Sequence, residues 1–111
     1  MTKLNTVTFL GKSGTEYGFD VYSWGTGFKK DYGAVYFITE RCNNYNGGYS
    51  HNRIYVGQTN DISSRFDDHH KQNCFDKHSA NCVCIYSEQD EDKRIEIEGD
   101  LIDNYSPPCN G

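Results

Sequence analysis

The sequence predicts an α+β fold, in which a mostly antiparallel central sheet is flanked by helices and extended by an N-terminal β-hairpin. Short segments of alternating or continuous apolar residues fill the first half of the chain. Two helical patterns with capping residues lie in the second half, and one more apolar strand separates them. This order is typical of α+β domains. With 111 residues the chain has room for one domain, residues 1–111, which we divide into a hairpin extension (1–31) and a core (33–110).

The hairpin is predicted from two alternating segments and the turn between them. Residues 7–10 and 17–22 each alternate apolar and polar side chains, which is typical of half-buried strands. Between them lies Gly-Lys-Ser-Gly at 11–14. The end of a phosphate-binding loop has a similar sequence, but that loop needs a glycine where this chain has Thr6. We therefore interpret 11–14 as a hairpin turn.

Three further strands are predicted in the core. Residues 33–39 form a nearly continuous apolar run, which indicates a central strand, and 53–56 form a second strand that we expect to pair with it antiparallel. The polar segment 43–52 contains Gly-Gly and is predicted to be a loop. Residues 82–86 form another apolar strand.

Two helices complete the predicted fold. Asn60 or Asp61 is suited to cap a helix that runs to about Lys71. Ser87 is predicted to cap a second helix that runs to about Tyr105, where two prolines follow. The acidic residues at the start of this second helix suit the positive end of the helix dipole.

The last helix carries an acidic residue within its apolar stripe. With 100° per residue, the stripe is made of Ile95, Ile102, Tyr105, Leu101 and Ile97. Glu98 falls inside it, and a carboxylate there is costly unless it is paired or binds a metal. Glu98 is therefore either a salt-bridge partner of an arginine, a residue at a solvated edge, or a functional carboxylate.

The first helix has a comparable pair of polar residues. Arg65 and His69 are four residues apart, so they share one flank of the face that Ile62 and Phe66 define. A guanidinium forks onto phosphate oxygens, and the pair is suited to clamp a phosphate. The alternative is an ordinary solvated pair on the helix surface.

The cysteines indicate reduced thiols. The chain has five of them, and residues 1–11 lack the apolar core of a signal peptide, which predicts a cytoplasmic protein. The spacing of Cys74, His78, Cys82 and Cys84 offers four zinc ligands. Because a single residue separates Cys82 from Cys84 in an apolar strand, we favour core or surface thiols over a zinc site.

The charge distribution argues against a typical nucleic-acid binder. The net charge is −5, and residues 88–103 alone carry eight acidic and two basic side chains. The rest of the chain is therefore close to neutral, without the basic face that such proteins usually show. No apolar run approaches the roughly 20 residues that span a bilayer, so no membrane association is expected.

Six short motifs together resemble the GIY-YIG nuclease superfamily. Residues 33–36 are Gly-Ala-Val-Tyr and 54–57 are Ile-Tyr-Val-Gly. Arg65 stands eight residues after Gly57, and His69 one helical turn later. Glu98 opens Glu-Gly-Asp-Leu-Ile, and 105–110 are Tyr-Ser-Pro-Pro-Cys-Asn. The resemblance covers 33–110 and departs from the family at Ala34, where the family usually has glycine. The chain thus resembles a small stand-alone domain of this superfamily.

The resemblance implies a DNA endonuclease that hydrolyses phosphodiester bonds with a divalent metal. Glu98 would hold a single Mg²⁺ or Mn²⁺, with waters at the other positions. Arg65 would bind a non-bridging phosphate oxygen. Tyr36 would activate the attacking water, with His69 relaying or taking its proton.

The same resemblance assigns roles to four further positions. Tyr55 would orient water or phosphate, and Asn110 would tie the C-terminal segment to the site. Gly57 and Thr59 would lie against the substrate, because glycine lets backbone approach closely where the strand turns toward the helix.

Two alternatives stay open beside the nuclease. One is a nucleic-acid-binding module of the same fold with weak catalysis, and the other is a protein-interaction domain that uses the acidic helix. The expected substrate is duplex or branched DNA. Because a domain of this size has no room for a separate targeting unit, specificity would come from the domain itself, a homodimer or a targeting partner.

Overall fold

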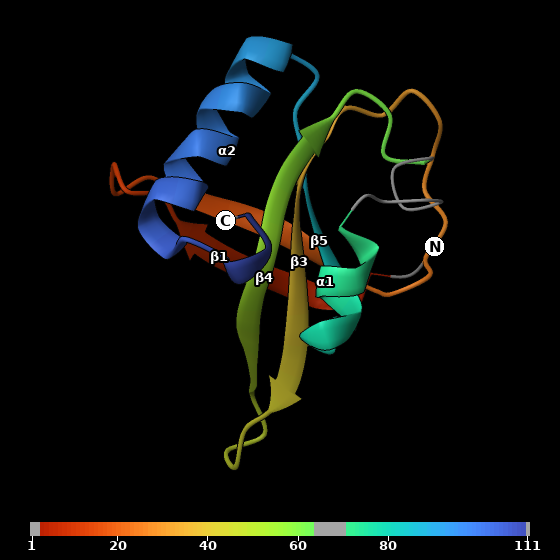
Figure 1. Cartoon of the computed structure of the whole chain (residues 1–111), viewed down its shortest axis with the longest axis vertical. Helices are drawn as coiled ribbons and strands as arrows, with labels where there is room; N and C mark the ends of the chain where they lie inside the picture. Colours follow the sequence, from red (N-terminus) through yellow and green to blue (C-terminus); the bar gives the residue numbers. More distant parts are fainter. Residues whose placement is uncertain (1–2, 64–70, 111) are drawn as a thin grey trace.

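The fold is an α+β arrangement, as predicted, built on one five-stranded sheet (Figure 1). The computed structural model describes residues 3–63 and 71–110. The strands are β1 (Asn5–Leu10), β2 (Glu16–Ser23), β3 (Ala34–Asn43), β4 (Tyr49–Thr59) and β5 (Cys82–Ser87). The helices are α1 (Gln72–Lys77) and α2 (Glu91–Tyr105), and η1 (Pro108–Asn110) is a single 3-10 turn. The sheet order is β1-β2-β5-β3-β4, with antiparallel pairing throughout these strands.

The predicted hairpin joins the core through its second strand. β2 pairs with β5 from Asp20 opposite Ile85 to Ser23 opposite Cys82, so the hairpin extends the central sheet. Its apolar side chains also enter the common core, where the rings of Phe9 and Phe37 stack with centroids 4.4 Å apart. Extension and core therefore share one sheet and one hydrophobic face.

The central strand β3 supplies apolar side chains to both faces of the sheet. All six residues from its start to Thr39 are buried. Val35 and Phe37 pack in the core beneath α2, while Tyr36 and Ile38 pack in a second core with Phe75 of α1. This explains why the sequence of β3 is continuously apolar rather than alternating.

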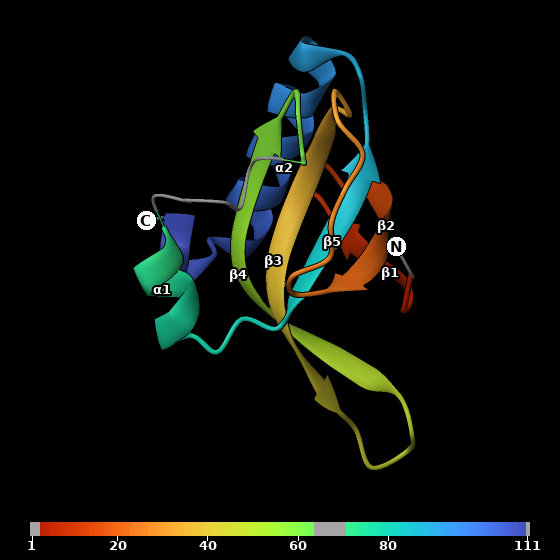
Figure 2. The ribbon, with the colours of Figure 1, turned by 90° about the vertical axis from the view of Figure 1, so that its right-hand side faces the viewer.

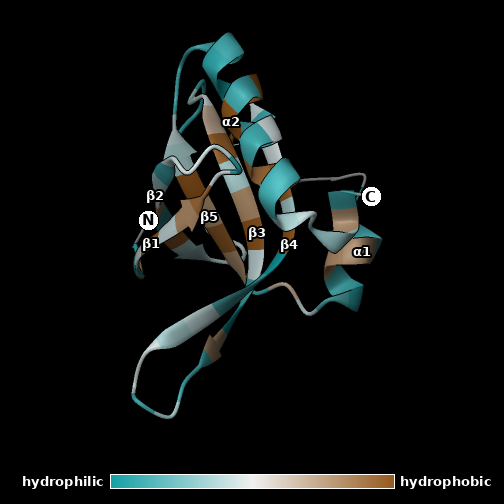
Figure 3. Cartoon of the chain, turned by 90° about the vertical axis from the view of Figure 1, so that its left-hand side faces the viewer, coloured by the Kyte–Doolittle hydropathy of each residue, from teal (hydrophilic) through white to brown (hydrophobic). Residues whose placement is uncertain are grey.

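The predicted loop at 43–52 is wrong, because β3 and β4 continue past the sheet as a two-stranded ribbon (Figure 2). The register shifts at Ile38/Thr39, and pairing then continues to Asn43 opposite Tyr49. Figure 3 shows that this ribbon is largely hydrophilic. Backbone hydrogen bonds hold it, with help from the Arg41 guanidinium 4.0 Å above the Tyr49 ring, so no apolar pattern marks it in the sequence.

Most of the first predicted helix, from Asn60 or Asp61 to about Lys71, lies outside the described residues, because these exclude 64–70. Residues 60–63 form a bend and a turn. The Asp61 carboxylate accepts hydrogen bonds from the Ser63 amide (3.0 Å) and hydroxyl (2.6 Å), which stabilise the turn. The described helix α1 begins at Gln72, where the predicted helix ends.

The last helix begins later than predicted but ends at the expected residue. Its N-cap is Asp90 rather than Ser87, which belongs to β5. The Asp90 carboxylate accepts hydrogen bonds from the amides of Asp92 (2.9 Å) and Lys93 (3.4 Å). After Tyr105 the backbone turns at Ser106, whose φ is 44°. Among the described residues, neither helix is long and apolar enough to cross a bilayer.

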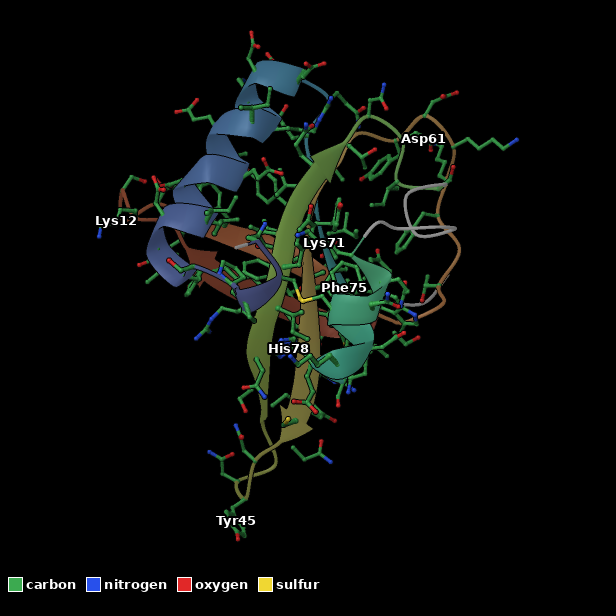
Figure 4. All side chains as sticks on the ribbon, viewed as in Figure 1. Lys12, Tyr45, Asp61, Lys71, Phe75 and His78 are labelled. Atoms are coloured by element: carbon green, nitrogen blue, oxygen red, sulfur yellow. A yellow bond between two sulfur atoms is a disulfide. The ribbon has the colours of Figure 1, made fainter. Side chains whose placement is uncertain are left out.

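The hairpin turn is fastened to α2 by Asp100. Its carboxylate accepts hydrogen bonds from the Ser13 amide (2.9 Å), the Ser13 hydroxyl (2.7 Å) and the Tyr17 hydroxyl (2.8 Å), and its carbonyl accepts from Lys12 (3.0 Å). A Cβ at Gly11 would collide with this carboxylate. Lys12 marks the turn in Figure 4. The glycine therefore lets the turn close onto the helix, which is a structural role and not phosphate binding.

This contact predicts a pH-dependent stability. The hydrogen bond from Ser13 is the main cause that lowers the pKa of Asp100 below its ordinary value of 3.8. A lowered pKa means that the ionised form stabilises the fold above about pH 5, and that this contribution is lost as the pH falls through the folded-state pKa. We expect the difference in Tm between the wild type and Asp100→Asn to narrow below about pH 4.

Thermal unfolding from about pH 6 to about pH 3 measures how this difference changes as the pH falls toward the lowered pKa of Asp100. The control is Asp103→Asn, which removes a carboxylate from an exposed position of the same helix and leaves the hydrogen bonds of Asp100 in place. A difference for Asp100→Asn that depends on pH no more than that of the control would contradict the assignment.

Candidate active site

The two tyrosines expected in the site lie side by side on the face of the sheet that carries α1. Tyr36 comes from β3 and Tyr55 from β4, and their ring centroids are 6.0 Å apart. The Tyr55 ring also contacts Phe75 of α1, at 5.4 Å between centroids. Tyr36 is 0% exposed and Tyr55 is 9% exposed. The tyrosines are therefore packed into the second core rather than displayed on the surface.

Gly57 makes room for Tyr36. The two residues are direct partners across β3 and β4. A Cβ at Gly57 would collide with the Tyr36 hydroxyl end and come 2.9 Å from the Tyr55 ring. The Tyr36 ring therefore crosses β4 at the one place where that strand has no side chain. Since β4 is the edge strand, the Tyr36 hydroxyl lies close to the edge of the sheet.

Thr59 holds the turn that leaves β4. Its hydroxyl accepts the Asp61 amide hydrogen (3.1 Å) and donates to the Asp61 carbonyl (3.3 Å). The Ile62 amide donates to the Tyr32 carbonyl (3.1 Å), so the turn is also attached to the residues before β3. The hydrogen bond from the Ser63 hydroxyl lowers the pKa of the half-buried Asp61.

Arg65 and His69 follow this turn in the chain but lie outside the described residues. Their expected clamp on a phosphate therefore stays a prediction. The described part of the chain fixes only the two ends of the segment that carries them, the turn at Ile62 and the start of α1.

Asn110 is fixed to the edge strand beside Gly57. Its side-chain oxygen accepts the Val56 amide hydrogen (2.9 Å), and its side-chain nitrogen donates to the Val56 carbonyl (2.8 Å). The amide thereby pairs with β4 as a neighbouring strand would. It satisfies both outward polar groups of Val56, and this ties η1 to the middle of β4.

Glu98 lies at the rim of the packed face of α2, not in its centre. The buried residues of this helix are Arg94, Ile97 and Leu101, whereas Ile95 is 49% exposed. The stripe that the sequence predicted is therefore rotated, and Glu98 is half-buried at its border. Because α2 packs on the face opposite the tyrosines, Glu98 and the two tyrosines belong to opposite faces of the sheet.

A comparison with models of known protein families identifies the family of this chain. The model of the GIY-YIG catalytic domain matches residues 32–110. The chain belongs to the GIY-YIG family. No curated protein and no solved structure matches it significantly. GIY-YIG proteins are endonucleases that act on DNA and generally depend on a divalent metal, so a nuclease-type function is supported for this chain.

Sequence reasoning missed Arg94, a buried arginine that contacts β4 beside Gly57. It is 3% exposed, and its Nε donates to the Gln58 side chain (3.0 Å), next to Gly57. Its Nη1 donates to the carbonyls of Glu88 (3.0 Å) and Gln89 (2.9 Å), which lie just before α2. The sequence did contain a sign that Arg94 is buried, because on the helical wheel it falls between Leu101 and Tyr105, within the predicted apolar stripe.

Two of the five cysteines differ from the expectation of reduced thiols, whereas Cys42, Cys82 and Cys84 are free. Cys74 of α1 and Cys109 of η1, which are 35 positions apart in the sequence, form a disulfide. The four-ligand zinc set, which the sequence analysis did not favour, is not assembled, because Cys82 and Cys84 lie in the core beneath α2, whereas Cys74 packs against the second core. Burial raises the pKa of Cys84 to about 12, as fits a thiol of the core.

Replacing Gly57 tests whether Tyr36 really crosses β4 there. We expect Gly57→Ala to lower the free energy of unfolding by about 1–3 kcal/mol, because the new methyl group overpacks against the two tyrosine rings. Urea denaturation measures the change. Gly99→Ala is the matched control: its Cβ meets no neighbour, and alanine should stabilise α2 by about 0.5–1 kcal/mol. Equal effects of the two variants would contradict the close approach.

Replacing Asn110 tests its bond to the edge strand. Asn110→Asp keeps the shape but sets a carboxylate oxygen against the Val56 carbonyl, so we expect a loss of about 1–3 kcal/mol in the free energy of unfolding. The control is Asn46→Asp, which adds the same charge in an exposed turn and keeps the acceptor for the Gly48 amide. If urea denaturation gave the same free energy of unfolding for Asn110→Asp as for the wild type, η1 would be held by other contacts.

Proposed function

We propose that this protein is a divalent-metal-dependent endonuclease that hydrolyses phosphodiester bonds in DNA. The observation that carries the proposal is the packing of Tyr36 and Tyr55 over Gly57 at the edge strand of a GIY-YIG domain. The edge position supports the proposal because no further strand of the described chain pairs with β4, whose outer edge is joined by Asn110 of η1 at Val56.

The donor set supports one metal ion held by Glu98. Mg²⁺ is usually held by one or two carboxylates together with waters and phosphate oxygens. Of the other carboxylates on α2, that of Asp100 is engaged by Ser13 and Tyr17, and the remaining four are exposed: Glu91, Asp92, Glu96 and Asp103. Glu98 is half-buried and stands one helical turn after Arg94, whose side chain reaches Gln58 of β4. When bound, Mg²⁺ or Mn²⁺ would neutralise the scissile phosphate and stabilise the leaving oxygen.

The protein's own residues are proposed to position and activate the reactants. Arg65 binds a non-bridging oxygen and offsets the charge of the transition state. Tyr36 takes a proton from the attacking water, and His69 relays or receives it. An ordinary phenol, with a pKa of about 10, is almost fully protonated at pH 7, so this role requires a positive charge beside it. Arg65 is the proposed source within the chain.

The remaining residues are proposed to shape the cleft. Tyr55 orients water or phosphate beside Tyr36, and Gly57 and Thr59 border the substrate where β4 ends. Asn110 is a positioning residue, because its two hydrogen bonds to Val56 hold the strand beside Gly57. Arg94 acts similarly from the other side through Gln58.

One observation favours a nucleic-acid-binding module of the same fold as the second candidate. The Tyr36 side chain is fully buried, so water or phosphate must replace the groups that cover its hydroxyl before it acts as a base. A protein in which that does not happen would bind DNA and cut it slowly. The two candidates differ in metal-dependent cleavage and not in binding.

The decisive experiment incubates the pure protein with linear, supercoiled and branched DNA, with and without Mg²⁺ or Mn²⁺. We expect cleavage only with the metal. Glu98→Gln and Arg65→Ala should each lower the rate by at least about 10²–10³-fold, as the loss of one group that stabilises the transition state does. The Tm of both variants should stay close to that of the wild type.

Glu96→Gln is the control for Glu98→Gln, since it removes the same charge from the exposed side of α2. Undiminished cleavage by Glu98→Gln or Arg65→Ala would refute the assignment of that residue. DNA binding by the wild type without cleavage under any metal condition would favour the binding module.

A further inference from the structure

Three side chains with sulfur and nitrogen donors converge between α1 and η1. The ligand atoms of Cys74, His78 and Cys109 all lie within 4.8 Å of one another. Cys74 and His78 are half-buried, and Cys109 is buried. Figure 4 shows the disulfide beside α1, with His78 at the end of the same helix. The cluster is thus formed by two segments that lie far apart in sequence.

We propose that Cys74, His78 and Cys109 form a Zn²⁺ site when the disulfide is reduced. Two thiolates and one imidazole are a donor set that zinc prefers, with a fourth position left for water or another ligand. Zn–S and Zn–N bonds of about 2.3 and 2.0 Å in a tetrahedron set the ligand atoms about 3.5–3.8 Å apart. The three atoms therefore need to move little once the sulfur–sulfur bond opens.

The local structure keeps the three ligands together without the disulfide. Cys74 and His78 are four residues apart at the end of α1, so they share one face of the helical turn. The His78 amide donates to the Cys74 carbonyl (3.2 Å), which closes that turn. Fully buried Phe75 anchors the helix on the sheet, and Asn110 anchors the residue next to Cys109 on Val56.

Disulfide and zinc site exclude each other, because the same two sulfurs form both. A phosphine or dithiol reductant supplies two electrons, the sulfur–sulfur bond breaks, and two protons from water complete the two thiols. Zinc then replaces these two protons and binds the two thiolates and the neutral imidazole. An added disulfide oxidant removes the two electrons again, re-forms the bond and releases the metal.

This site is separate from the proposed nuclease metal. Glu98 offers oxygen on α2, where a hard cation is expected, whereas the cluster offers sulfur and nitrogen on the other face of the sheet. The buried thiols Cys82 and Cys84 also lie on the α2 side and do not contribute. The proposal therefore holds whether or not the protein cuts DNA.

The test titrates the pure full-length protein with Zn²⁺ in competition with a chromogenic chelator, before and after anaerobic reduction. We expect one equivalent of tightly bound zinc per reduced chain and none per oxidised chain. Co²⁺ in place of Zn²⁺ should give thiolate-to-cobalt charge-transfer absorption, which reports sulfur ligands directly. A reduced protein that binds no zinc, or Co²⁺ binding without that absorption, would overturn the proposal.

Variants assign the ligands. Cys109→Ser should abolish stoichiometric binding. His78→Ala leaves the disulfide partners intact and should weaken binding by at least about 10–100-fold, the loss that even an indirect partner of a metal ligand causes. Cys42→Ser, at a free cysteine of the ribbon, and Glu98→Gln should bind zinc like the wild type. Full binding by His78→Ala, or loss of binding in either control, would overturn the assignment, and His78→Ala gives a result even if Cys109→Ser does not fold.

Discussion

The register between β3 and β4 is the constraint on which the site depends. It sets Tyr36 opposite Gly57 and places Tyr55 on the same face two residues earlier. Because side chains alternate along a strand, a slip of β3 by one residue would move Tyr36 to the face beneath α2 and away from Tyr55. The burial of β3 on both faces opposes such a slip, since every shifted residue would leave its own core. Packing far from the tyrosines therefore determines where they lie.

An edge strand at the centre of a site needs its outward polar groups satisfied without another strand. Asn110 pairs with the backbone of Val56, and Arg94 reaches the side chain of Gln58. These two contacts involve Val56 and Gln58, the residues directly before and after Gly57. They hold β4 in place and protect its edge from pairing with a second molecule. Gly57 itself has no side chain, so the Tyr36 ring is able to cross the strand there.

The sequence predicted what depends on local pattern and missed what depends on distant contacts. Alternating or continuous apolar residues marked the five strands, and the family motifs marked Tyr36 and Gly57. The ribbon beyond the sheet was missed because backbone pairing holds it rather than apolar burial. The Asp61 carboxylate caps a turn where the first helix was predicted to begin, and most of that predicted helix, at 64–70, lies outside the described residues. The disulfide of Cys74 could not be derived from spacing, since its partner comes from a segment that only the folded chain brings near.

The C-terminal segment links the two sides of the molecule, and this follows from three short-range contacts. Tyr105 ends α2 and packs its ring against Phe37 on one face of the sheet, with centroids 6.0 Å apart. Asn110 lies at the edge, on Val56, and Cys109 is bonded to α1 on the other face. A chain that passes from one face to the other around β4 fixes α1 relative to α2. Since the proposed site takes its tyrosines from one face and Glu98 from the other, residues 105–110 are the part of the fold that couples them.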